Sequence, residues 1–169
     1  MDANAVINIL SGNTLNIVNS SNIFSCDQIN LWENITIGTG STIILNGGST
    51  ISDAKCAIQT LFNTNPTVNI DNATFNKNNI SIAISNGLSA GSFFRNVNIR
   101  CETFIGSNVP ANLLAPYTGS RSAIGLIFNG VPNFLLSSSS PNYSFFFKFI
   151  QVGFFTNHSS YLLENATFE

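Results

Sequence analysis

Charged residues are scarce in this sequence. The 169 residues include 6 Lys and Arg and 8 Asp and Glu, so 8% are charged, against about 25% in ordinary soluble domains. Six scattered cations are too few for a protein that binds nucleic acid through its phosphates, so we expect no nucleic-acid partner. The one histidine, His158, leaves little room for His-dependent chemistry.

Cysteines and long hydrophobic runs are scarce too. Cys26, Cys56 and Cys101 are odd in number and form no C-x-x-C motif, so we expect neither a disulfide framework nor a zinc site, and no cofactor. The most apolar stretch, 145–155, is about half the length that spans a bilayer, so no transmembrane segment is expected. No signal peptide is visible at the start, and the end falls inside a repeat, which suggests a fragment of a longer chain.

Uncharged polar residues take the place of the missing charges. The chain has 26 Asn, 21 Ser and 13 Thr beside 20 Ile and 15 Phe, which is enough apolar material for a core. Apolar and polar residues alternate with period two, which predicts strands with one buried face, and no window of 11 or more residues keeps a helical period. The alternating segments are 14–19, 34–38, 67–71, 80–85 and 96–99.

These strand segments recur at a longer period. The sequence Asp-Asn-Ala-Thr-Phe at 71–75 returns as Glu-Asn-Ala-Thr-Phe at 164–168, close to four steps of about 23 residues. The segments 19–23 and 46–51 fit the same place, at steps of 28 and 24 residues. Such a repeat buries its apolar side only by stacking on copies of itself at about 4.8 Å. We therefore predict an all-β, right-handed parallel β-helix (solenoid) of about seven coils of 22–25 residues, with 1–169 as one segment.

The scarcity of charge and the many asparagines suit such a stack. Like charges piled at that spacing would repel one another. Asn tolerates the left-handed conformation that tight corners need, and its amide can bond to an Asn in the coil above or below.

Four motifs follow one another in a characteristic order: G-x-x-L-x-I at 12–17, W-x-x-I-x-I-x-x-G at 32–40, I-x-D-A-x-x-A-I at 51–58 and N-x-T-F-x-x-N at 72–78. This order resembles the right-handed parallel β-helix repeat proteins of the secreted bacterial surface type, and most of all exported cargo of the type IX secretion class. The resemblance implies a secreted or cell-surface, adhesin-like structural segment that binds a glycan or a protein partner and performs no catalysis.

Residues 106–122 interrupt the repeat. Pro110 and Pro116 exclude a central strand there, so we predict a loop insertion. In a solenoid such insertions project from one face, often the binding face. Tyr117, Arg121 and Tyr143 are therefore the candidate contact residues; the alternative is a loop that is simply tolerated.

Two other functions remain open on the sequence. A polysaccharide lyase or glycoside hydrolase of the same fold would need Asp27, Asp53 and Asp71 within about 6 Å of one another, beside a Lys or Arg. A self-stacking assembly module would associate end to end through unpaired strand edges.

Overall fold

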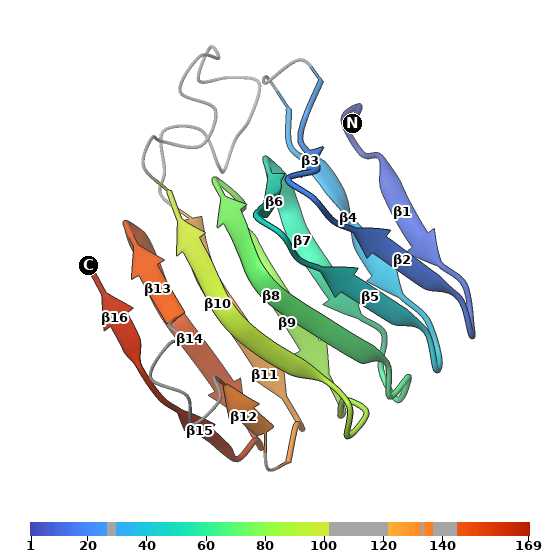
Figure 1. Ribbon diagram of the computed structural model, residues 1–169, viewed down its shortest axis with the longest axis vertical. Helices are drawn as coiled ribbons and strands as arrows, with labels where there is room; N and C mark the ends of the chain where they lie inside the picture. The colour runs from blue at the N-terminus through green and yellow to red at the C-terminus, as the bar shows by residue number, and fades with distance from the viewer. Residues whose placement is uncertain (27–29, 102–121, 133, 137–144) are drawn as a thin grey trace.

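The computed structural model describes residues 1–26, 30–101, 122–132, 134–136 and 145–169, and every regular element in this part of the chain is a β-strand. The strands form two sheets in which all pairs are parallel. Figure 1 shows the chain winding from the N-terminal strands at one side to the C-terminal strands at the other. The prediction of an all-β parallel β-solenoid is confirmed.

Sheet A has six strands, and each is hydrogen-bonded to the next. In order across the sheet they are β1 (Val6–Ile9), β4 (Trp32–Ile37), β7 (Ala54–Thr60), β9 (Ile80–Ser85), β11 (Ser122–Asn129) and β14 (Ile150–Asn157). Sheet B holds the other ten: β2 (Thr14–Ile17), β3 (Asn22–Ile23), β5 (Thr42–Leu45), β6 (Ser49–Ser52), β8 (Thr67–Asn76), β10 (Phe93–Arg100), β12 (Phe134–Leu136), β13 (Phe145–Lys148), β15 (Tyr161–Leu163) and β16 (Ala166–Phe168).

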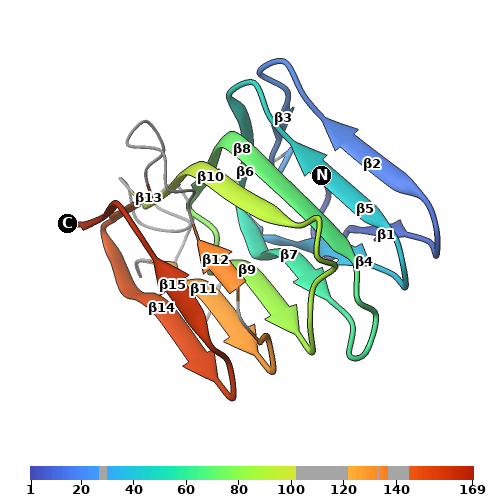
Figure 2. The ribbon, with the colours of Figure 1, turned by 60° about the horizontal axis from the view of Figure 1, so that its bottom comes forward.

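We call a strand of sheet A, with the strands of sheet B that follow it, a rung. Rungs 1 to 6 begin with β1, β4, β7, β9, β11 and β14, which makes about five full turns. Figure 2 shows the turns from sheet A to sheet B side by side along one edge. Residues with equivalent positions in successive rungs form a column, and neighbours in a column lie about 4.8 Å apart.

The count of about seven coils was too high, because one winding is much longer than the others. Val6 pairs with Asn34, 28 residues later, and Cys56 with Ile80, 24 residues later. Ile80, however, pairs with Ile124, 44 residues later. The chain between β10 and β11 takes up the length that was predicted to form extra coils.

The repeated Asn-Ala-Thr-Phe motif shows the same effect. Phe75 and Phe168 do stand in one column, as the repeat predicted, through the pairs Phe75–Ile99, Ile99–Phe147 and Phe147–Phe168. They are three rungs apart rather than four. Ile23 and Ile51 continue this column toward the first rung, so the place predicted for 19–23 and 46–51 in the repeat is confirmed.

The core lies between the two sheets, and its side chains change along the axis. One inward column of sheet A runs Ile7, Ile35, Ile58, Ile82, Leu126, Phe154. The later rungs add an aromatic cluster, in which the Phe128 ring lies 5.4 Å from that of Phe134 and 5.3 Å from that of Phe154. Aliphatic columns in the first rungs therefore give way to edge-to-face rings in the last.

Asparagines occupy the corners, as expected. Of thirteen non-glycine residues with positive φ in the described chain, eight are Asn. Side-chain amides also bond between rungs: Asn86 Nδ2 donates to Asn63 Oδ1 at 2.9 Å, and Asn157 Nδ2 donates to Asn129 Oδ1 at 3.2 Å. The asparagine content therefore serves both roles that the composition suggested, backbone conformation and inter-rung bonding.

A buried amide braces the turn between rungs 3 and 4. Asn78 is fully buried; its Oδ1 accepts a hydrogen bond from the Ala54 backbone N–H at 2.9 Å, and its Nδ2 donates to the Ile51 carbonyl at 2.9 Å. Both partners belong to the corner between rungs 2 and 3. The side chain therefore satisfies two backbone groups that a turn leaves without strand partners.

Candidate functional site

The predicted contact residues Tyr117, Arg121 and Tyr143 lie outside the described residues, as does most of the insertion predicted at 106–122. Its last residue, Ser122, is buried and opens β11. The insertion and its contact role therefore stay predictions.

Asp53 and Asp71, two of the three acidic residues considered for catalysis, lie apart. Asp53 lies at a corner, where its Oδ1 is 3.1 Å from Lys77 Nζ. Asp71 lies within β8, beside Arg95 of the next rung, six residues away from Lys77 along the chain. Asp27 lies outside the described residues. Asp53 and Asp71 are thus each placed next to a cation in separate columns, and nothing in the described structure pairs them.

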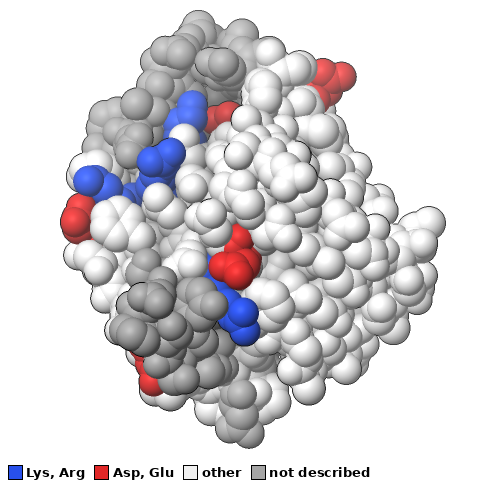
Figure 3. All heavy atoms as spheres, in the orientation of Figure 1, with Lys and Arg blue, Asp and Glu red and all other residues white. Residues whose placement is uncertain are grey.

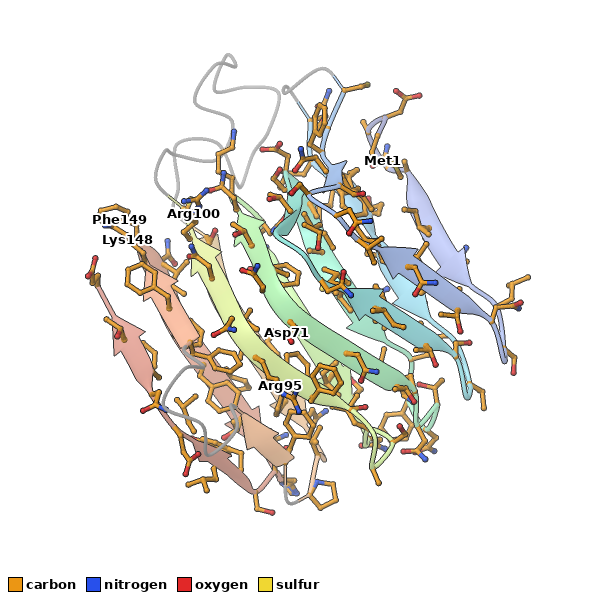
Figure 4. The ribbon with its side chains drawn as sticks, in the orientation of Figure 1. Met1, Asp71, Arg95, Arg100, Lys148 and Phe149 are labelled. Atoms are coloured by element: carbon orange, nitrogen blue, oxygen red, sulfur yellow. The ribbon has the colours of Figure 1, made fainter. Side chains whose placement is uncertain are left out.

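Most of the described cations gather at the corner where sheet B leads into sheet A. Arg100 and Lys148 are direct neighbours across β10 and β13, and Lys148 Nζ lies 3.1 Å from Glu169 Oε2. With Asp53 and Lys77 these residues form what we call the corner cluster. Figure 3 shows its positive side chains grouped toward the later rungs of an otherwise largely uncharged face, and Figure 4 shows Arg100 and Lys148 close together.

Aromatic rings accompany these cations. Lys148 Nζ lies 5.0 Å from the ring centre of Phe149 and 5.9 Å from that of Phe146, within reach of a cation–π attraction. Phe149 has φ +57°, which is unusual for a bulky side chain. Farther along sheet B, the Arg95 guanidinium lies 4.4 Å from the Phe93 ring centre. The corner cluster is thus a mixed cation and aromatic surface whose charges are largely balanced.

The outer side of sheet A carries a feature that sequence analysis missed. Two outward columns run along it and are polar in rungs 1–3 except at Val6 and Cys56. The first column is Val6, Asn34, Cys56, Ile80, Ile124, Val152; the second is Asn8, Thr36, Gln59, Ala83, Ile127, Phe155. Every member in rungs 4–6 is apolar. We call these last six side chains, Ile80, Ala83, Ile124, Ile127, Val152 and Phe155, the apolar face.

Period two alone could not have found the apolar face. The segment 80–85 predicted Ile80 inward and Ser81 outward, yet Ser81 is 1% exposed and Ile80 lies in the outward column. The cause is a bulge that starts between β4 and β7, where Asn34 pairs with Cys56 but the next residue, Ile35, pairs with Ile58. The extra residue shifts the alternation of every later strand that continues this register.

Tryptophan, histidine and cysteine side chains often bind ligands or react, and the structure gives the surroundings of each of them in this chain. Trp32 is fully buried, and its indole N–H donates to the Ser52 carbonyl at 2.7 Å. It is therefore part of the core. His158 is exposed in a turn. The cysteines form no disulfide. Burial raises the pKa of the Cys56 thiol to about 12, so this thiol stays protonated and unreactive near neutral pH.

Within the described residues, no three His, Cys, Asp or Glu side chains come together as a metal site would require. The same part of the chain contains no helix with the length and apolar character needed to cross a bilayer.

Comparisons with known proteins give no relative for this chain. No protein-family model matches it, and neither the curated proteins nor the solved structures contain a match.

Proposed function

We propose that this chain is a structural and binding segment of an exported bacterial surface protein, adhesin-like in role, and that it performs no catalysis. The observation that carries the proposal is the stack itself, in which every strand of sheet A from β4 to β11 is hydrogen-bonded on both edges. Such a stack is rigid and carries little charge, and it suits a rod that displays loops along its length. A β-solenoid is compatible with a structural or binding role.

Export is tested on the parent reading frame. We expect a signal sequence upstream and a sorting domain downstream, and we expect external protease to cleave the protein on intact cells. The same protease treatment of a cytoplasmic protein of the host is the control. A full-length protein that resists protease on intact cells and is cleaved only after lysis contradicts the export proposal.

Binding is tested with a glycan array and with variants of the predicted contact residues. Tyr and Arg dominate binding energies in many interfaces, so Tyr117→Ala combined with Arg121→Ala and Tyr143→Ala should weaken any observed binding at least tenfold. Tyr161→Ala, at the exposed tyrosine of β15, is the matched control and should leave binding unchanged. Equal loss in both variants contradicts the assignment.

End-to-end association stays a prediction for the 169-residue chain. The outermost strands of sheet A, β1 and β14, each have one partner. Stacking of such edges is open-ended and gives a series of species that grows with concentration. Size exclusion at two concentrations tests this, and a constant monomer at both argues against it.

A further inference from the structure

We infer that the apolar face is a contact surface between two copies of this chain. The same two columns hold Asn34, Thr36 and Gln59 in the earlier rungs. Sheet A therefore does not need apolar residues on its outer side in order to form. Phe155 is 51% and Val152 41% exposed, so the face presents large apolar side chains to its surroundings, which water disfavours.

The chemistry of the face points to a partner like itself. Strands β9, β11 and β14 contain no charged residue, and the six side chains of the apolar face have no hydrogen-bonding group. A glycan or a charged protein would lose hydrogen bonds to water there and regain none. A second copy brings an equally neutral, apolar surface, so the six side chains of each copy would meet neither a charge nor a polar group.

The shape of the face also suits a two-fold pair. Its side chains form two parallel ridges, Ile80–Ile124–Val152 and Ala83–Ile127–Phe155, along the axis of the solenoid. When two sheets pack face to face, side chains of one enter the spaces of the other. In a two-fold pair the same patch serves both copies, so the contact closes at a dimer.

The size of the face limits the affinity. Three rungs at about 4.8 Å and six residues at about 3.3 Å give a face of roughly 280 Å² per copy. Stable interfaces bury about 800 Å² per partner. We therefore expect a weak dimer that forms at micromolar or higher concentrations, with the polar residues around the face adding to the buried area.

Sedimentation velocity over a concentration series tests the inference on the whole 169-residue chain. The wild type should pass from monomer to dimer and stop there. Ile127→Lys puts a charge in the middle of the face and should raise the dimer dissociation constant at least tenfold. Gln59→Lys is the matched control, since Gln59 lies in the same column two rungs earlier; it should leave the constant unchanged. Gln59→Ile extends the apolar face into rung 3 and should lower the dimer dissociation constant.

Circular dichroism checks that each variant is folded, and Ile124→Gln replaces Ile127→Lys if the latter is not. A wild type that stays monomeric throughout the series overturns the inference. So does a dimer weakened equally by Ile127→Lys and Gln59→Lys. Species larger than a dimer that Ile127→Lys leaves unchanged indicate end-to-end stacking instead. Glycan binding and export are independent of this result, so the inference and the proposed function fail separately.

Discussion

The first three rungs and the last three rungs fill the same columns with different side chains. In the earlier half the core is mostly aliphatic and the outer side of sheet A mostly polar. In the later half the core contains stacked and edge-to-face rings, and two outward columns of sheet A are apolar. The difference shows that the backbone stack tolerates both kinds of side chain, so the stack alone does not dictate the side chains of the later half.

The aromatic filling has a structural consequence of its own. One column holds Ala57, Ser81, Gly125 and Gly153 in successive rungs. A Cβ on Gly125 would lie 2.5 Å from the Gly153 carbonyl oxygen and 3.1 Å from the Phe147 ring. The backbone of the next rung therefore excludes a Cβ at position 125, where the earlier rungs accept alanine or serine, and the Phe147 ring closes the same space from the core.

The largest effect is expected from removing a ring of the later half. Phe128→Ala should lower the free energy of unfolding by about 3–5 kcal/mol, because it deletes a fully buried ring that contacts Phe94, Phe134 and Phe154. Ile37→Val, in the same column of the earlier half, should cost about 0.5–1.5 kcal/mol. Urea unfolding measures both. Similar losses would mean that the aromatic cluster is not what stabilises the later rungs.

The second-largest effect is expected at Asn78, whose buried side chain links the earlier and the later rungs. Asn78→Ala removes partners from two buried backbone groups, and we expect a loss of about 1–3 kcal/mol. Asn16→Ala, at an exposed position on β2, should change the stability by less than about 0.5 kcal/mol. Native-state hydrogen exchange adds a local readout: the Ala54 amide should exchange faster in Asn78→Ala only. Unchanged protection there would contradict the role of the amide.

A methyl group tests the tight packing of the later half. Gly125→Ala should cost about 1–3 kcal/mol in urea unfolding, because its Cβ meets backbone that cannot move aside easily. Ser81→Ala is the control, since Ser81 already carries a Cβ in the same column; it should cost clearly less. If both variants unfold at the same urea concentration, the close approach of the Gly153 carbonyl does not require glycine at position 125.

The last effect appears only at alkaline pH and concerns the Cys56 thiol, which stands where rungs 4 and 5 have isoleucine. The folded chain holds the pKa of Cys56 near 12, above its ordinary value of 9.0, so its contribution to stability is complete below pH 9. That contribution is lost as the pH rises from about 9 toward 12, because the unfolded chain ionises first. Cys56→Ala should therefore lose less stability than the wild type between these pH values. Parallel curves would contradict the burial of this thiol.

Period-two alternation and the recurring corner motif were enough to predict the strands, the parallel stacking and the shared column of Phe75 and Phe168. These signals are local or repeat in fixed order, so they can be read without coordinates. Small motifs could still be aligned wrongly. The similar triplets Cys56-Ala57-Ile58 and Ile82-Ala83-Ile84 invite an alignment that is wrong, since Cys56 pairs with Ile80 and Ile58 with Ile82.

Ion pairs were the least predictable contacts. Asp53 and Lys55 lie only two residues apart, so sequence proximity alone favours an ion pair between them. Instead Lys55 pairs with Glu33 of the previous rung and Asp53 with Lys77 of the next. At a corner of the solenoid the chain changes direction, so side chains two residues apart in sequence point apart. The nearest partners of a corner residue are then the equivalent residues of the previous and the next rung.

Composition and periodicity by themselves determined that this chain is a charge-poor parallel stack with asparagine at its corners, because each coil must repeat the pattern of the one beneath it. Only the tertiary structure decided the number of rungs, since one winding of 44 residues and one of 22 occupy the same height. It alone decided which isoleucines face outward, because a one-residue bulge reverses the alternation that follows it.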